Sequence, residues 1–270
     1  MSRNKIDKTG ETNISNEGCV MKIVEYNNML DIIIEFEDEH KYRLHTRYQA
    51  FKKGNCKNPF FASVFGYGYL GIDKNGNVPK TYESKDGKWC NTWEYNKWMS
   101  MLKRCFDNKY KEKHPTYKNT ACCDRWLCFA NFLEDFEILK QEYNWSKDEK
   151  LNLDKDILNK NNKIYGLENC VLVPQWINTL FIKCDASRGD CPVGVSYHKG
   201  AKKYQAHCNI NGKRIRLGLY NTAEQAFNAY KIAKEQEIKR IVNDCVSKGY
   251  MAKDSRLYNA MISYQVKIDD

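Results

Sequence analysis

One stretch constrains the fold more than any other, residues 203–234: KYQAHCNINGKRIRLGLYNTAEQAFNAYKIAK. Its Asn211-Gly212 dipeptide favours a type I′ turn between two antiparallel strands. Side chains alternate across a strand, so each strand divides into an apolar set and a polar set. The apolar set is Tyr204, Ala206, Cys208, Ile210, Ile215 and Leu217. The polar set is Lys203, Gln205, His207, Asn209, Arg214 and Arg216.

A helical pattern follows the hairpin. Thr222 is a suitable N-cap, and helical periodicity continues to about Val242. The helical side chains that can cover the apolar face of the sheet are Ala226, Phe227, Tyr230 and Ala233. Residues 192–242 are therefore predicted to form two or three strands packed on one helix, with the polar face of the sheet exposed.

The positive charge of the chain is concentrated in the same segment. The 270 residues include 44 Lys and Arg and 34 Asp and Glu, a formal net charge of +10. Residues 192–242 hold ten Lys or Arg and three Glu, a local net charge of +7. Such a face suits the phosphates and base edges of duplex DNA. The alternative is a solvated polar face without a partner.

The segment PVGVSYHKGAKKYQAHCNINGKRIRLGLYNTAEQAFNAYKIAK, residues 192–234, resembles the AP2/ERF family of DNA-binding domains. The resemblance implies a three-stranded sheet that enters the major groove. The DNA contacts that it implies are Ser196, His198, Lys203, Gln205, His207, Asn209, Arg214 and Arg216. The sequence departs from the family at Val193, Ser196 and Asn209, where arginine is usual, and at Arg216, where tryptophan is usual. The target sequence therefore does not transfer.

A second segment carries a candidate catalytic motif: LDKDILNKNNKIYGLENCVLVPQWIN, residues 153–178. The run ENCVLV predicts a strand, and Pro174 is well placed to start a helix. The segment resembles the ββα unit of HNH nucleases, although its loop is longer than usual. In that family a first-strand histidine activates water, and an Asn or His on the helix holds a divalent metal.

No histidine stands at the first-strand position, where Asp154, Lys155 or Asp156 falls instead. The resemblance then implies that Asp154 or Asp156 acts as metal ligand or base. It implies Asn178 as a metal ligand and Asn169 as an orienting residue, with Mg²⁺ or Mn²⁺ as the cofactor. Lys155 could neutralise charge in the transition state. Two alternatives stay open: the unit grips DNA without cutting it, or its asparagines are ordinary loop residues.

Together the two motifs resemble phage-encoded homing-type endonucleases. We expect a sequence-directed protein that binds double-stranded DNA and is a divalent-metal-dependent endonuclease hydrolysing phosphodiester bonds. The alternative is a catalytically inactive, HNH-derived DNA-binding protein of phage origin, acting as a regulator or as an inhibitor of a host defence nuclease. RNA binding through aromatic-rich helices is a third, weaker alternative.

The remaining segments complete an α+β, multi-module organisation. Residues 1–70 read as short strands and predict a small β-module, barrel-like or SH3-like. Residues 71–90 are rich in Gly, Asn, Lys and Asp and predict a linker. Residues 91–185 are predicted to form a helical region that ends in the HNH-like unit. For the tail, residues 243–270, the sequence predicts no structure.

Two helices are predicted in the middle of the chain. Asn91 and Glu94 form a capping-box pattern for the first, and the second is expected over residues 124–141. The expected core stripes are Trp98, Met101, Leu102 and Cys105 on the first helix, and Trp126, Phe129, Leu133 and Phe136 on the second.

Cysteine usage and hydropathy bear on metal binding and location. The twelve cysteines include no Cys-x-x-Cys pair, so buried thiols are favoured over structural Zn²⁺. The zinc alternative rests on Cys105, Cys122, Cys123 and Cys128, with Cys184 and Cys191 forming a second pair. The first residues are polar, and no later apolar run approaches membrane-spanning length. We therefore expect a soluble, cytoplasmic protein without a membrane partner, acting inside a bacterial host cell if it is of phage origin.

Overall fold

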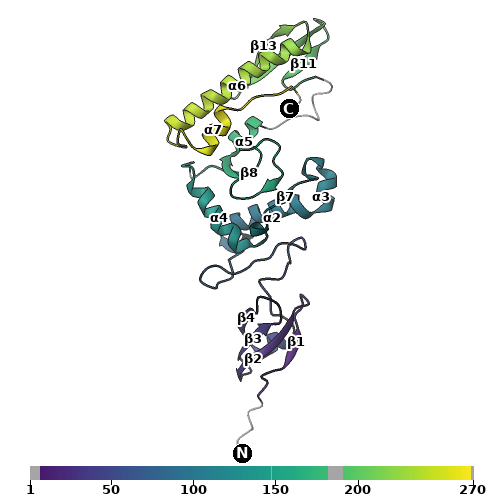
Figure 1. Ribbon diagram of the computed structural model, residues 1–270, viewed down its shortest axis with the longest axis vertical. Coiled ribbons are helices and arrows are strands. Elements are labelled where there is room, and N and C mark those ends of the chain that lie inside the picture. Colours follow the sequence, from purple (N-terminus) through teal and green to yellow (C-terminus); the bar gives the residue numbers. More distant parts are fainter. Residues whose placement is uncertain (1–6, 147, 182–190, 269–270) are drawn as a thin grey trace, which may run out of the picture. The chain divides into compact units, whose positions relative to one another are not determined.

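The computed structural model describes residues 7–146, 148–181 and 191–268 (Figure 1). The chain forms two compact units, Met1–Glu134 and Asp135–Asp270, which are described one after the other. Helices and small antiparallel sheets occur in both units. The predicted mixed α+β class is therefore confirmed.

The first unit begins with a four-stranded antiparallel sheet in the order β1-β2-β3-β4, with bounds Thr12–Ile14, Val20–Asn28, Asp31–Phe36 and Arg43–Thr46. Burial alternates along β3, where Ile32, Ile34 and Phe36 are buried. They pack with Met21, Ile23 and the short helix α1 (Tyr48–Lys52). Within the described residues β1 and β4 remain the two edges of this sheet, so the predicted barrel is wrong and the module is an open sheet.

The segment predicted as a linker contains a β-hairpin. Strands β5 (Tyr82–Lys85) and β6 (Lys88–Asn91) pair across Asp86-Gly87, two residues with φ of 50° and 75°. Positive φ at both central residues suits a type I′ turn, which Asp-Gly favours. The linker prediction missed this local signal.

Helix α2 (Trp93–Phe106) buries the predicted stripe of Trp98, Met101, Leu102 and Cys105. Its N-cap is Thr92, whose Oγ1 accepts a hydrogen bond from the Tyr95 amide at 3.2 Å, so the predicted cap at Asn91 was one residue early. The short elements that follow are α3 (Asn108–Lys113), η1 (Pro115–Tyr117), β7 (Ala121–Cys122) and η2 (Asp124–Leu127).

The second predicted helix is divided. Helix α4 spans Phe129–Gln141, and Cys128 separates it from the 3₁₀ turn η2. Phe129, Phe132 and Phe136 are fully buried, whereas Leu133 is only half-buried, so Phe132 takes the place that the helical pattern gave to Leu133. The break at Cys128 explains the change, because Trp126 lies on a different helical segment.

The second unit contains the ββα order predicted for the central motif. Strand β8 (Leu151–Asp154) pairs antiparallel with β10 (Val171–Pro174), and helix α5 (Gln175–Asn178) follows at once. The short strand β9 (Ile164–Tyr165) lies in the connecting loop, and the 3₁₀ turn η3 (Thr179–Phe181) extends α5.

The sheet β11-β12-β13 and helix α6 form the other part of this unit. The strands span Val195–His198, Lys203–Ile210 and Lys213–Tyr220, in that order across the sheet. Helix α6 spans Ala223–Ser247, with the predicted Thr222 as N-cap and an end five residues beyond the predicted one. Ala226 and Phe227 of α6 cover the sheet.

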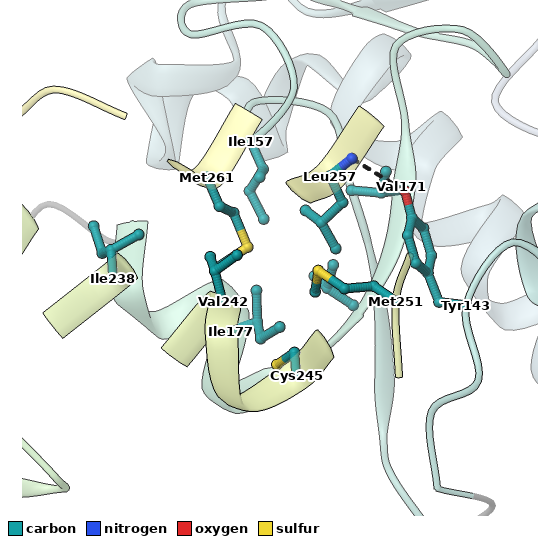
Figure 2. Packing of buried hydrophobic residues seen from close by; sticks show 11 residues of the cluster. Tyr143, Ile157, Val171, Ile177, Ile238, Val242, Cys245, Met251, Leu257 and Met261 are labelled. Atoms are coloured by element: carbon teal, nitrogen blue, oxygen red, sulfur yellow. Dashed lines mark hydrogen bonds between the residues drawn. The ribbon is translucent and has the colours of Figure 1, made fainter. Parts of the chain in front are cut away.

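The second half of α6 packs on the ββα unit. Ile238, Val242 and Cys245 are buried against Val171 and Ile177 (Figure 2). A single 25-residue helix therefore supplies part of the core for both the sheet and the ββα unit.

The tail, for which the sequence predicted no structure, contains a helix that packs beside α6. Helix α7 (Arg256–Ile262) buries Leu257 and Met261 beside α6, and the Leu257 amide donates to the Tyr143 hydroxyl at 3.2 Å (Figure 2). Val266 then packs with the sheet and the first half of α6. The Val266 carbonyl accepts a hydrogen bond from Lys231 Nζ at 3.1 Å, and the Val266 amide donates to Glu235 at 2.9 Å. Two hydrogen bonds therefore bind the tail to α6.

No helix in the described ranges is both long enough and apolar enough to cross a membrane.

Candidate nucleic-acid interface and ββα unit

All eight predicted DNA contacts lie on one face of the C-terminal sheet. Residues paired directly across antiparallel strands point to the same side. The pairs that the register makes are Ser196 with Gln205, His198 with Lys203, His207 with Arg216, and Asn209 with Arg214. The eight residues of these pairs form what we call the polar sheet face.

The opposite face is the one that α6 covers. Val195, Ala206 and Cys208 are buried, as the alternation predicted for β12. Ile215, which the pattern placed in the apolar set, is 40% exposed. It lies near the tip of the hairpin, beyond Ala226 and Phe227 of the helix that form the core there.

A bulge in β13 keeps both arginines on the polar sheet face. Ala206 pairs with Gly218 and His207 pairs with Arg216, so Leu217 is an extra residue on β13. Leu217 packs into the core. Without this bulge, the alternation that places Gly218 opposite Ala206 would turn Arg216 toward the helix.

A hydrogen bond to α6 holds the hairpin turn between β12 and β13 in place. Asn211 and Gly212 have φ of 50° and 73°, as the predicted type I′ turn requires. The Asn211 amide donates to Glu237 Oε1 at 2.9 Å. Glu237 is buried, and its hydrogen bonds from Arg240 lower the pKa of its carboxyl, so the acceptor stays ionised.

Gly194, just before β11, lies against Tyr230 of α6. Its φ is +76°, and a Cβ built on it would lie 2.1 Å from the Tyr230 ring. Only glycine fits there, because any side chain would overlap the aromatic ring that packs the helix onto the sheet.

The two histidines of the polar sheet face differ. The Ala201 amide donates to His198 Nδ1 at 3.0 Å, which leaves Nε2 as the hydrogen-bearing nitrogen of the neutral ring. His207 Nδ1 lies 3.5 Å from Arg214 Nη2. Burial, followed by the charges of Arg214 and Arg216, lowers the pKa of His207 below its ordinary value. At neutral pH the His207 ring is therefore uncharged between two guanidinium groups.

In the ββα unit, Asp154 is the last residue of β8 and shapes a turn. Its Oδ1 accepts from the amides of Asp156 at 2.8 Å and Ile157 at 2.9 Å. Burial raises the pKa of its carboxyl above the ordinary value, against the lowering effect of those two hydrogen bonds. Asp154 is therefore part of the backbone architecture of the loop.

Lys155 and Asp156 are already paired with neighbours. Lys155 is 5% exposed, and its Nζ donates to Asp156 Oδ1 at 2.6 Å and to the Asn162 carbonyl at 2.7 Å. Asp156 itself is exposed. An ammonium group in direct contact competes with a cation for the Asp156 carboxylate.

Asn162 shapes the loop that follows β8. Its Nδ2 donates to the carbonyls of Lys155 at 2.9 Å and Ile164 at 2.8 Å, and its Oδ1 accepts from the Ile164 amide.

The register separates the remaining two predicted residues. Asn169 lies two residues before Val171, the partner of Asp154, and its amide donates to the Gly166 carbonyl at 3.1 Å. Asn178 ends α5, which follows Pro174, the partner of Leu151 at the far end of β8 from Asp154. Over the ranges described, no hydrogen bond joins Asn178 to Asp154 or Asp156.

The donor set at this end of β8 does not fit a Mg²⁺ or Mn²⁺ centre well. Mg²⁺ requires near-octahedral oxygen ligands. The two carboxylates here are engaged by backbone amides and by Lys155. Nowhere in residues 7–146, 148–181 and 191–268 do three or more His, Cys, Asp or Glu side chains gather as metal ligands. Among the cysteines of the zinc alternative, Cys184 lies outside the described residues.

Sequence analysis missed Arg256, which holds the loop before β10. Its Nη2 donates to Glu142 Oε2 at 2.7 Å. The guanidinium also donates to the carbonyls of Leu167, Glu168 and Cys170 at 2.9 to 3.0 Å. Arg256 and Glu142 are separated by 114 residues, so no local pattern could have indicated the contact.

In comparisons with family models, curated proteins and solved structures, no match to this chain was found. The geometry of the chain itself therefore carries the functional proposal.

Proposed function

We propose that the protein binds double-stranded DNA through the polar sheet face. The observation that supports this proposal is that the eight residues form direct cross-strand pairs on the side opposite α6. A pleated face of Lys, Arg, Gln, Asn, Ser and His offers hydrogen-bond donors and acceptors in a regular array. Base edges in the major groove present a matching pattern.

The charge of the sheet supports the same partner. Residues 191–223 contain six Lys or Arg and no Asp or Glu. Lys199, Lys202 and Lys213, next to the polar sheet face, are exposed. Phosphate neutralisation by such residues releases counterions and gives binding that weakens steeply with salt. The major groove, about 12 Å wide, admits a two-stranded ribbon of this kind.

The test is selection from a randomised duplex pool, followed by titration of the selected duplex. Arg214→Ala together with Arg216→Ala should weaken binding and flatten its salt dependence. Lys239→Ala, on the exposed side of α6, is the control and should leave the affinity for the selected duplex close to wild type. Equal affinity and equal salt slope for wild type and the double variant would overturn the proposal. Tighter binding of single-stranded RNA than of the duplex would favour the RNA alternative.

A second candidate function is phosphodiester hydrolysis by the ββα unit. The observation in its favour is the acidic pair Asp154 and Asp156 at the end of β8, with the pKa of Asp154 raised by burial. Functional sites often hold such perturbed groups. The contacts of Lys155 favour instead a DNA-binding protein in which the unit is a scaffold.

Nicking of a plasmid that carries the selected site, with Mg²⁺ or Mn²⁺, separates the two. Metal-dependent nicking by wild type that Asp156→Asn abolishes would support an endonuclease. If wild type binds the site and leaves the plasmid intact, the ββα unit has a structural role.

A further inference from the structure

A cleft of about 460 Å³ lies within the C-terminal unit. It is bounded by α5 and η3, by the β12–β13 turn and by the second half of α6. The volume falls within the range of small-molecule sites, about 300–1,000 Å³. The proposal made for the polar sheet face does not account for this cleft.

One wall of the cleft is apolar and held in place. It is formed by Trp176, Leu180, Ile241, Cys245 and Tyr250. Trp176 Nε1 donates to Glu149 Oε1 at 3.1 Å, and the Trp176 ring packs edge to face against Trp145 at 6.2 Å. Two contacts therefore restrain the indole that faces the cleft.

Most charges along the other wall are already neutralised in pairs. Arg240 donates to Glu237 at 2.8 and 2.9 Å, and the Asn211 amide donates to the same carboxylate. Asp244 lies 3.5 Å from Arg240 and 3.9 Å from Lys248. The two acids of the cleft are thus shared among Arg240, Lys248 and the turn.

Lys234 is the exception. It lines the cleft, it is half-buried, and within the part of the chain that the structure describes its Nζ has no hydrogen-bond acceptor. Burial is the main influence on this ammonium and lowers its pKa, while the nearby Glu237 acts in the opposite direction. A partly desolvated cation without an acceptor is unfavourable unless an anion meets it.

We propose that this cleft binds a small organic anion with a flat apolar body and a single anionic group. The anionic group would accept hydrogen bonds from Lys234, and the body would pack against Trp176 and Tyr250. Carboxylates, phosphates and sulfonates share the chemistry needed at Lys234. The proposal goes beyond DNA binding and does not rest on it.

The probe for the test is 8-anilinonaphthalene-1-sulfonate, an aromatic monoanion that fluoresces in apolar sites. The full chain should bind it saturably, and Lys234→Met should weaken that binding by about tenfold or more, the usual weight of a charge-assisted hydrogen bond. Lys239→Met is the matched control, since Lys239 is exposed on the same helix outside the cleft. It should bind the probe as wild type does.

Energy transfer gives a second measurement that does not depend on Lys234. Trp176→Phe should reduce tryptophan-sensitised probe emission, because Trp176 lines the cleft. If Lys234→Met fails to fold, Ile241→Trp fills the cleft while Lys234 stays and should also weaken binding. Equal probe affinity for wild type and the cleft variants, or no saturable binding, would overturn the proposal.

Discussion

Lys155 and Asn162 hold each other through two hydrogen bonds, each from a side chain to the other residue's carbonyl. Lys155 Nζ donates to the Asn162 carbonyl at 2.7 Å, and Asn162 Nδ2 donates to the Lys155 carbonyl at 2.9 Å. These contacts close the loop that follows β8. Lys155, one of the three residues at the expected first-strand position, therefore has a structural role in the described protein.

Lys155→Met tests that role. It should lower the free energy of unfolding by about 1–3 kcal/mol, because a buried carbonyl loses a charged donor. Urea denaturation provides the measurement, with Lys163→Met at an exposed position of the same loop as control. A Lys155→Met variant as stable as wild type would contradict the structural role and return Lys155 to the catalytic candidates.

Arg256→Ala should destabilise the second unit by about 2–4 kcal/mol, because Glu142 and several backbone carbonyls would lose their hydrogen-bond donor. Arg256→Lys should not restore stability, because an ammonium cannot reproduce the planar fork that reaches these acceptors. Arg125→Ala is the control: its ion pair with Glu134 is about half exposed on both sides, and such pairs contribute about 0–1 kcal/mol. The denaturant midpoint of Arg125→Ala should lie close to that of wild type, and the midpoints of Arg256→Ala and Arg256→Lys should both lie well below it. A midpoint of Arg256→Lys equal to that of wild type would contradict the prediction.

Gly194→Ala should be far more destabilising than Gly249→Ala. Both glycines have positive φ, +76° and +71°, but only Gly194 has a ring where a Cβ would lie. We expect about 1 kcal/mol for Gly249→Ala from backbone strain alone and at least about 2 kcal/mol more for Gly194→Ala from overlap with Tyr230. Thermal denaturation measures both. Partial recovery in a variant that also carries Tyr230→Ala would assign the difference to that overlap.

The titration of His207 should affect both stability and DNA binding. Its pKa is lowered in the folded chain, so the unfolded chain takes up the proton first as the pH falls. The His207 contribution to stability is therefore present above pH 6.5, its ordinary pKa, and is lost as the pH falls toward the lower folded value. NMR titration of the imidazole gives the folded pKa directly.

Arg214→Ala with Arg216→Ala should raise the pKa of His207 toward its ordinary value while leaving it lowered, because burial is the larger cause. DNA phosphates should stabilise the imidazolium, so affinity for duplex should rise as the pH falls through the window below pH 6.5. The measurement is made on a His198→Gln background, because His198 lies on the same face; there the affinity of a variant that also carries His207→Gln should not change with pH. The same pH independence in the His198→Gln variant alone would remove His207 from the interface.

Local patterns predicted the parts of the fold that local chemistry determines. Asn211-Gly212 and the alternation along β12 predicted the hairpin and its polar face, and the resemblance of residues 153–178 to an HNH unit implied the order β8, β10, α5. The bulge at Leu217 depends on how the sheet packs on α6, so the alternation of apolar and polar residues along the strand could not predict it.

Long-range contacts account for most of what the sequence did not predict. The tail is ordered because Leu257 and Met261 find a core formed by residues from β10, α5 and α6. The candidate catalytic residues came from the resemblance to HNH nucleases, and that resemblance did not show that Lys155 would be buried against Asn162.

If the protein binds duplex DNA as proposed, helix α6 has a consequence for the spacing of its contacts. Phe227 is the last buried residue that α6 contributes to the core of the sheet, and Ile238 is the first that it contributes to the core of the ββα unit. At 1.5 Å per residue these positions are about 17 Å apart, the length of about five base pairs of duplex. One continuous helix allows little adjustment of that distance, so the two elements would act as a fixed ruler along the duplex. Inserting or removing base pairs between the two contacted segments should therefore weaken binding, even when every contacted base is kept.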